Sequence, residues 1–404
     1  MIRISSQQIF NGGINRLQGI NSNLVDTQQQ ISTGKKVNKP SDDPVAAARI
    51  LKLDQELRQN DSYTRNATLA DNRLKQEENA LQSSVDIIQR VRELTVQAGS
   101  GSLSANDRQS IAAELKERLG QLANITNTQD ASGEYIFSGF QGSTQAFAKN
   151  DEGNWVYQGD EGQRKLEIDE GVTVPISDHG KGIFVDVPRS VSVENRESDD
   201  GYISGLEVVD EDALRDASPS DAPRKSIYLA VDSNNKVIEV DEDGNPTTPP
   251  KEFGDAGEEI DVYGMKMTVN DAVDGDTFEI GINRKQSIFG TIEKLVDGLE
   301  SGAKGSDRGN AEYDALIAES LTNLDNAQEK IILKQTELGG RLNAVESTTA
   351  FLEDSGLYTK EIRSQLQDVD YAEAISNLSF QSFVLQAAQQ SFAQVSRLSL
   401  FDRL

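Results

Sequence analysis

Apolar residues recur every seven positions near both ends of the chain. The N-terminal series is Phe10, Leu17, Leu24 and Ile31, and the C-terminal series is Tyr371, Leu378, Leu385 and Phe392, with Val395 three residues further on. This spacing lines apolar side chains along one face of a helix, and such a face needs a partner helix. The pattern predicts a helix at each end. It also predicts that the ends pair with each other or with neighbouring subunits, so we expect these positions to form a subunit-assembly seam.

Two longer helices are predicted inside the terminal ones. Residues 45–98 contain no proline or glycine, with Asp43 as a suitable N-cap and Pro44 at the first helical position. Their apolar positions continue the spacing: Ala67, Leu74, Leu81 and Ile88. The most regular series in the chain is Ile317, Leu324, Ile331, Leu338, Val345 and Leu352. We expect these two helices to pack on each other. A change of heptad phase around Gly356 predicts a domain boundary at 353–361, mirrored by one at 34–43.

A shorter helix and then a β-rich region follow the first long helix. Ser104 and Asp107 have capping-box spacing before a helix that runs to about Thr128, and the aromatic stretch 135–140 resembles a strand. Five later runs are rich in β-branched or aromatic residues and are bounded by turn residues: 154–158, 165–168, 182–187, 226–231 and 236–240. The sequences at 151–153 and 241–244 suit hairpin tips. Residues 246–259 contain three prolines and predict a loop.

The patterns together predict a mainly α fold with a β-rich insert. Helices from both chain ends form a long coiled-coil bundle, and an outer β domain is inserted between them. We expect an inner terminal domain of residues 1–43 with 361–404. A long-helix bundle domain then comprises 44–140 with 284–360, and an acidic outer domain comprises 141–283.

Composition and charge narrow the classes of function. The chain has 404 residues, a net charge of −27 and no cysteine, so disulfides and thiolate metal sites are excluded. Most of the excess negative charge falls in residues 150–283, and such a surface repels phosphate backbones, which argues against nucleic-acid binding. There is no basic-then-apolar signal sequence and no apolar run long enough for a membrane span.

No arrangement of residues predicts catalysis. The single histidine, His179, makes neither a zinc site nor a catalytic triad, and no phosphate-binding glycine motif is present. Asp241, Glu242 and Asp243 lack the later glutamate of a calcium loop, so we interpret them as solvated surface. The only tryptophan, Trp155, is expected in the core of the β domain. We therefore predict a protein that is not an enzyme and has no cofactor and no metal.

Several motifs occur in an order that resembles a known family. Residues 31–35, Ile-Ser-Thr-Gly-Lys, precede residues 40–44, Pro-Ser-Asp-Asp-Pro. This pair resembles the flagellin superfamily, and the second motif is similar to its hook–filament junction branch. Residues 135–139, 275–278 and 391–402 resemble the same branch. The motif positions we single out are Gly34, Pro40, Ser41, Asp42, Asp43 and Pro44.

The resemblance implies a structural subunit of the bacterial flagellum, located outside the cell between hook and filament. It implies flagellar type III export without a cleaved signal peptide. It also implies four partners: further copies of the chain in a ring, hook-associated protein 1, flagellin and an export chaperone. Two alternatives stay open. The chain could be a flagellin filament subunit, or a secreted adhesin with a binding surface in residues 141–283.

Overall fold

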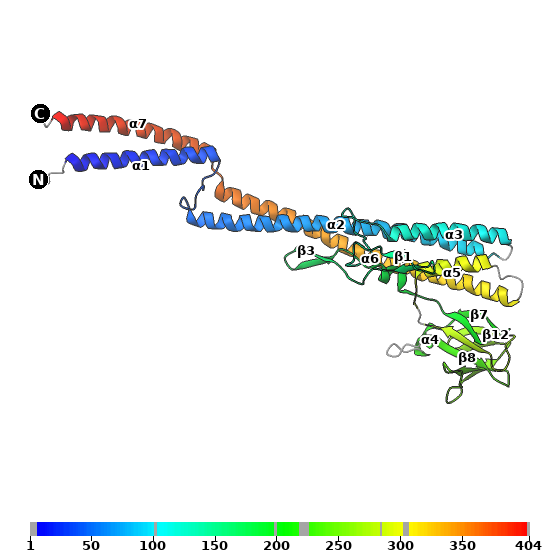
Figure 1. Cartoon of the computed structure of the whole chain (residues 1–404). Helices are drawn as coiled ribbons and strands as arrows, with labels where there is room; N and C mark the ends of the chain where they lie inside the picture. The colour runs from blue at the N-terminus through cyan, green and yellow to red at the C-terminus, as the bar shows by residue number, and fades with distance from the viewer. Residues whose placement is uncertain are drawn as a thin grey trace. The chain divides into compact units, whose positions relative to one another are not determined.

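The computed structural model describes residues 6–100, 103–197, 200–217, 226–282, 285–301 and 307–401 (Figure 1). It divides into two compact units. The first contains the chain up to Ala67, residues 168–170 and the chain from Ser347 onward, and the second contains 68–167 and 171–346. Two long helices, α2 (Pro44–Ala98) and α6 (Asp307–Gln367), contribute to both units. The predicted fold class, long helices from both chain ends with a β-rich insert, is confirmed.

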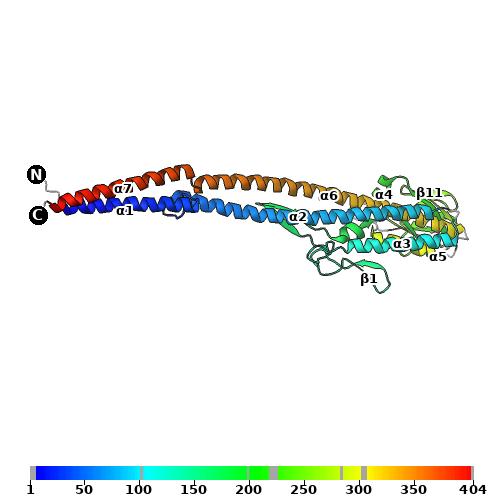
Figure 2. The ribbon, with the colours of Figure 1, turned by 90° about the horizontal axis from the view of Figure 1, so that it is seen from above.

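In the first unit the two terminal helices lie side by side. Helix α1 (Ser6–Thr33) runs antiparallel to α7 (Tyr371–Phe401), as both views show (Figures 1 and 2). Both contain few charged residues, so neither gains much from helix-surface ion pairs. Isolated helices with one apolar face are marginal in water. Each therefore depends on the other for burial of that face.

A short joint connects α1 to α2 and α6 to α7. The backbone N–H of Lys36 donates to the carbonyl of Gln367 at 2.8 Å, and that of Val369 donates to the carbonyl of Gly34 at 2.9 Å. Gly34 has φ +73°, and a Cβ there would lie 3.0 Å from the Tyr371 hydroxyl oxygen. The position thus needs glycine for both its backbone conformation and its neighbour. Beside the joint, an apolar cluster contains Val37, Ala46 and Ile50 with Ala47 and Leu366 against it.

Aspartates start the helices that leave the joint. Asp43 Oδ1 accepts the N–H groups of Val45 and Ala46 at 3.0 and 2.9 Å, which caps α2. Asp370 Oδ1 accepts those of Ala372 and Glu373 at 2.9 and 3.2 Å, which caps α7. Each cap satisfies donors that have no partner inside the helix.

The predicted domain boundary at 353–361 lies inside a continuous helix. Helix α6 continues through it to Gln367, and the chain leaves the helix only at 368–370. Gly356 lies inside the helix, where a Cβ would be 3.4 Å from the Asn60 side-chain nitrogen, and that nitrogen donates to the carbonyl of Leu352 at 2.9 Å. A helical glycine costs only about 1 kcal/mol. Packing against α2 therefore keeps the helix continuous while its apolar phase changes.

The second unit has a helical core built from distant segments. Helices α3 (Ala105–Thr126) and α5 (Ile288–Ser301) pack with parts of α2 and α6. The predicted capping box is confirmed, since Ser104 and Asp107 satisfy each other's backbone N–H groups. Several predicted heptad positions are fully or nearly fully buried here: Leu74, Leu81, Ile88, Leu324, Ile331 and Leu338.

Residues 135–187 complete this helical core instead of forming a separate layer of strands. The predicted strand at 135–140 is wrong because these residues form turns, and the run 182–187 lies mostly in a π-helix, η1 (Lys181–Val185). The turns bring Phe137, Phe147 and Phe184 together, each at most 1% exposed. Ring centroids of Phe147 lie 6.0 Å from Phe184 and 4.7 Å from Phe289 of α5.

Two short hairpins and one strand pair lie in the same segment. Strand β1 (Phe147–Lys149) pairs with β2 (Trp155–Tyr157), and β3 (Lys165–Asp169) pairs with β4 (Val172–Pro175). The predicted strands near 154–158 and 165–168 are thus confirmed. Trp155 packs against the helical core, with its ring centroid 6.0 Å from that of Phe289, and not in the β core where we expected it. The pair β5 (Val187–Pro188) and β14 (Lys285–Gln286) closes the segment.

The β domain proper has its own core. Strands β6 (Ser192–Glu197), β8 (Ser226–Val231), β9 (Lys236–Val240), β10 (Glu252–Asp255) and β13 (Thr277–Gly281) form a sheet of order β10-β9-β8-β13-β6. Strands β7 (Tyr202–Val208), β11 (Glu259–Val262) and β12 (Met265–Asn270) form a second sheet of order β11-β12-β7. Helix α4 (Glu211–Ala217) follows β7. The predicted strands 226–231 and 236–240 are confirmed, whereas the predicted loop 246–259 contains β10.

The two cores suggest a revision of the expected domain limits. The buried core of the β domain extends from Ile203 to Ile282, and none of the described residues between 188 and 287 belongs to the buried helical core. We therefore propose that the separable β domain comprises residues 191–283, and that residues 141–190 belong to the bundle domain.

Replacement of residues 191–284 by a short Gly/Ser linker tests this division. Pro188 and Lys285 are paired neighbours, so a short turn can join them. We expect the shortened chain to keep its helical circular dichroism and to unfold within a few degrees of the parent. Replacement of 145–280 is the matched control, because it removes Phe147 and Phe184 and should lower the unfolding temperature strongly. Equal unfolding temperatures for the two deletions would contradict the division.

Candidate assembly surface and its support

Helices α1 and α7 bury the predicted seam only in part. The half-buried positions are Leu17, Leu24 and Ile31 on α1 and Leu378, Leu385 and Phe392 on α7. Ala374 is 5% exposed, and the Thr27 hydroxyl donates to Gln381 Oε1 at 3.0 Å. Gly13 lets the Phe392 ring approach, since a Cβ there would lie 2.7 Å from it. The side chains of Phe10 and Val395 lie outside the described residues.

A second apolar set on α7 stays exposed. Its two phenylalanines, Phe380 and Phe383, face away from α1, whereas Tyr371 and Ile375 fall on the same side of the helix as Leu378. Tyr371 and Ile375 are 52% and 53% exposed, and Phe380 and Phe383 are 66% and 68% exposed. At about 100° per residue, Phe380 and Phe383 each lie two positions, about 200°, from Leu378 and Leu385 respectively. They therefore lie on the face opposite the α1 contact. Large exposed aromatic side chains gathered on one face are typical of protein–protein contacts.

The terminal helices are almost without charge. Helix α7 has no charged residue between Glu373 and Arg397, and α1 has only Arg16 and Asp26. Glutamine, serine and asparagine fill the exposed positions instead. Depletion of charge with exposed aromatic residues is the composition of an interface core, because uncharged amides and hydroxyls are less costly to desolvate than ions.

The motif between α1 and α2 forms an exposed turn with satisfied backbone groups. Asp42 Oδ2 accepts the N–H groups of Asn38 and Lys39 at 3.0 and 2.9 Å, and these bonds lower the pKa of the Asp42 carboxyl. The side chains of Pro40 and Ser41 are exposed, as are those of Asp42, Asp43 and Pro44. The two aspartates therefore shape the turn and cap the next helix, while the exposed surface of the motif stays available.

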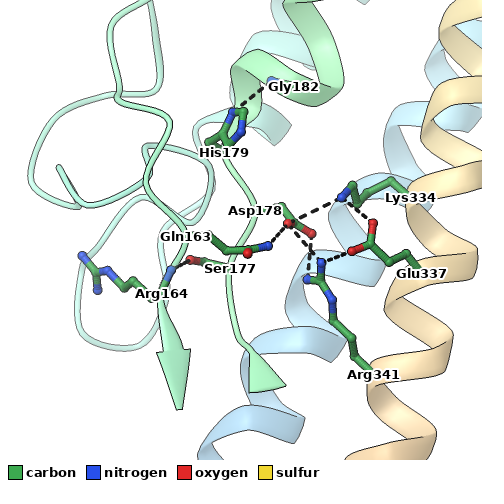
Figure 3. Close-up of polar contacts among 9 residues, drawn as sticks. All are labelled: Gln163, Arg164, Ser177, Asp178, His179, Gly182, Lys334, Glu337 and Arg341. Atoms are coloured by element: carbon green, nitrogen blue, oxygen red, sulfur yellow. Dashed lines mark hydrogen bonds and ion pairs between the residues drawn. The ribbon is translucent and has the colours of Figure 1, made fainter. Parts of the chain in front are cut away.

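A buried ionic cluster in the second unit attaches the 163–178 segment to α6 (Figure 3). Arg341 and Asp178 have side chains only 8% and 6% exposed, and Arg341 Nη1 lies 2.9 Å from Asp178 Oδ2. Gln163 Nε2 donates to the same carboxylate at 2.7 Å, and Lys334 Nζ lies 3.6 Å from it. Glu337 pairs with both Arg341 and Lys334.

The charges of this cluster fix its protonation. Burial would raise the pKa of Asp178, but the hydrogen bond and charge of Arg341 outweigh it and hold that pKa below its ordinary value. Beside it, His179 Nδ1 accepts the N–H of Gly182 at 3.0 Å, and Ser177 Oγ accepts that of Arg164 at 3.1 Å. These bonds hold a turn and the start of η1. They orient no nucleophile. Among the described residues, no cluster of three or more His, Cys, Asp or Glu side chains could hold a metal ion.

Two parts of this site do not follow from the heptad pattern. Phe380 and Phe383 fall outside the seven-residue series, and the charge-free stretch of α7 is the sequence signal that indicates them. Asp178 and Arg341 are 163 residues apart, and no local pattern connects them.

The fold defines a class of helical proteins in which both chain ends pair. Two family models match it: the bacterial flagellin N-terminal helical region over residues 4–142, and the C-terminal helical region over residues 321–403. They occur in this order and together match more than half of the chain. The chain belongs to the bacterial flagellin family.

Within this family the chain is similar over its whole length to particular flagellar proteins. It is 25% identical to flagellar hook-associated protein 3 of Escherichia coli strain K12 over 401 residues, which is 99% of each chain. Flagellin B of Vibrio anguillarum is 22% identical over 388 residues, or 92% of this chain and 90% of the relative.

Solved structures agree with this similarity. The structure of Xanthomonas campestris FlgL has a TM-score of 0.64 and 25% identity, covering 77% of this chain and 99% of that one. The flagellar junction protein FlgL of Legionella pneumophila has a TM-score of 0.62 and 28% identity, covering 80% and 100%. Separately, none of the helices in the described ranges has the length and apolar character needed to span a bilayer.

Substitution of Asp178 by alanine tests the buried cluster. It leaves Arg341 buried beside only one carboxylate partner, and loss of one member of a buried pair costs about 3–5 kcal/mol. We expect a fall of that size in the free energy of unfolding of the second unit, measured by urea titration of Trp155 fluorescence. The Lys116–Glu300 pair is 53% and 46% exposed, so Glu300→Ala is the matched control and should change stability by about 1 kcal/mol or less.

Proposed function

We propose that this chain is a structural subunit of the bacterial flagellum that joins the hook to the flagellin filament. The observation that carries the proposal is the alignment with hook-associated protein 3 over 99% of both chains. The match to a solved junction protein at 28% identity supports it. Flagellin B of Vibrio anguillarum matches over 92% of the chain at the lower identity of 22%, so a filament subunit is the second candidate.

The proposal extends to partners and place of action. We propose hook-associated protein 1 and flagellin as neighbours, with further copies of the chain in a ring and an export chaperone before assembly. The chain would act outside the cell after export without a cleaved signal peptide. As a structural subunit it would have no enzymatic activity, which fits relatives that are flagellar components.

The terminal helices would carry the assembly contacts. The half-buried set, from Leu17, Leu24 and Ile31 to Leu378, Leu385 and Phe392, would hold α1 on α7 within a subunit. The exposed set, Tyr371, Ile375, Phe380 and Phe383, would meet neighbouring subunits. Burial of one such ring contributes roughly 1.5–3 kcal/mol. The exposed turn at Pro40–Pro44 supplies a further surface beside the joint.

Deletion of the gene separates junction protein from flagellin. A cell without a junction subunit should keep its hooks and release flagellin into the medium, since the filament has nothing to attach to. A cell without its filament subunit should release no flagellin. Electron microscopy of cells and immunoblotting of the medium measure both. Filaments of normal length on the deletion strain would contradict the proposal.

Aspartate substitutions at two neighbouring positions of α7 distinguish the two contact sets. Leu385→Asp places an unpaired charge in the α1 contact, so we expect loss of terminal helix content by circular dichroism and loss of filaments. Phe383→Asp lies on the opposite face, so helix content should persist while filaments are lost. Neither should shift the unfolding temperature of the second unit, whose core contains no residue of α1 or α7.

Leu385→Met is the matched control for these substitutions. It keeps volume and apolar character, and we expect filaments to form. Normal filaments from Leu385→Asp would show that α1 and α7 need not pair for assembly. Normal filaments from Phe383→Asp would show that the exposed set is not an assembly surface.

A further inference from the structure

A small pocket lies in the second unit beside the buried cluster. It is lined by residues of α2, of the turns at 130–139 and of the 164–177 segment, among them Arg73, Glu77, Glu134, Arg164 and Ser177. All of these residues belong to one compact unit. The pocket therefore marks where the 128–178 stretch contacts the long helix α2.

Glu77 is the unusual group in this pocket. It is 2% exposed, and its Oε1 atom has no hydrogen-bond partner. A side-chain hydrogen bond with the Asp178 carboxyl also acts on Glu77, and it raises the pKa of Glu77. A buried carboxylate is costly, and such a group remains neutral unless a cation compensates it. Whether Glu77 is protonated thus depends on the charged groups that face it.

The cations around Glu77 already have carboxylate partners. On α2, Arg73 lies 2.9 Å from Asp130 and 3.2 Å from Glu134. Arg164 pairs with the same Glu134.

The two cations on α6 are also engaged. Arg341 pairs with Asp178 and Glu337, and Lys334 lies 2.6 Å from Glu337 and 3.6 Å from Asp178. The four cations named here, all in the described part of the chain, therefore already pair with other carboxylates, and Asp178 is the charged group that raises the pKa of Glu77 most.

The pKa values of the Glu77 and Asp178 carboxyl groups are shifted in opposite directions. Burial, and then the charge of Asp178, raise the pKa of Glu77 well above its ordinary value, while Arg341 holds the pKa of Asp178 below its own. Two interacting carboxyl groups titrate as a pair, and this pair favours one proton. That proton resides on Glu77, and the negative charge resides on Asp178, where Arg341 compensates it.

We propose that Glu77 is a proton-controlled latch between α2 and the 163–178 segment. With Glu77 protonated the pocket is closed and the segment stays packed on α2 and α6. Loss of the proton leaves two carboxylates in the same buried site with cations already committed to other partners. The segment then relieves the repulsion by separating from α2, which admits water to the pocket.

The sign of the pH dependence follows from linkage. A glutamate in an unfolded or opened chain titrates near pH 4.3. Between that pH and the higher pKa of folded Glu77, the closed state binds one more proton, so opening becomes about tenfold easier per pH unit. The dependence ends once pH exceeds the folded pKa. Asp178 acts in the opposite direction at acidic pH, where its protonation removes the pair with Arg341.

Hydrogen exchange of two backbone amides measures the latch directly. The N–H of Ile176 donates to the carbonyl of Arg164 at 2.8 Å, and that of Arg164 donates to Ser177 Oγ at 3.1 Å. In the unaltered chain we expect their protection factors to fall by up to tenfold per pH unit above about pH 5. In Glu77→Gln, which is neutral at every pH, they should stay constant.

Two controls make the result specific. Glu293 is a second half-buried carboxyl whose pKa is raised by burial, and Glu293→Gln should leave the pH dependence of Ile176 and Arg164 unchanged. Amides of β8 in the β domain should show no such dependence in any of the three chains. Parallel pH profiles for the unaltered chain and Glu77→Gln would overturn the proposal.

A measurement on the unaltered chain keeps the proposal testable if Glu77→Gln does not fold. The side-chain carboxyl carbon of Glu77 can be followed by NMR across the same pH range. We expect its titration well above that of exposed glutamates and coincident with the loss of protection at Ile176. Titration of Glu77 near pH 4.3 would overturn the proposal.

Discussion

The pairing of the first helix with the last one is the constraint on which the terminal unit depends. Neither α1 nor α7 has the ion pairs along its surface that would stabilise a single helix in water. Each buries its apolar face against the other. The backbone bonds between Lys36 and Gln367 and between Val369 and Gly34 fix where the pair begins. Aspartate caps then restart a helix on either side, so the geometry of the terminal pair is set by a few backbone groups at the joint.

Long-range helical order could be predicted from the sequence, whereas its interruptions could not. The heptads from Ile317 to Leu352 and the proline-free stretch after Pro44 predicted helices because periodicity is a local property that packing preserves. The change of heptad phase near Gly356 does not end α6, because a phase shift changes which face is buried without ending the hydrogen bonds of the helix. The aromatic run 135–140 failed for the opposite reason. Turns bury the ring of Phe137 in the helical core while Phe140 stays exposed, and β propensity reflects burial of large side chains as much as extended backbone.

The sequence predicts part of the candidate assembly surface and leaves the rest without a local signal. Leu378 and Leu385 were singled out by period, and the structure places them against α1. Phe380 and Phe383 share that helix but follow no seam period, so only the missing charges around them carry a signal. Asp178, Arg341 and Glu77 come from three distant segments, and their meeting depends on the fold as a whole. Buried polar groups of this kind are visible only once neighbours are known, since burial is what makes them unusual.

The positions of α1 and α7 in the sequence determine when the two helices can pair during synthesis. During synthesis α1 leaves the ribosome long before α7, its partner. Contacts such as Lys36 to Gln367 join residues more than 300 positions apart, and such closures are slow because the intervening chain must first be brought together. The second unit can form its core before α7 is made, but α1 cannot acquire its partner until α7 has left the ribosome. A nascent chain therefore carries α1 with its apolar face uncovered while the intervening residues are synthesised, and completion of α7 is the event that covers this face.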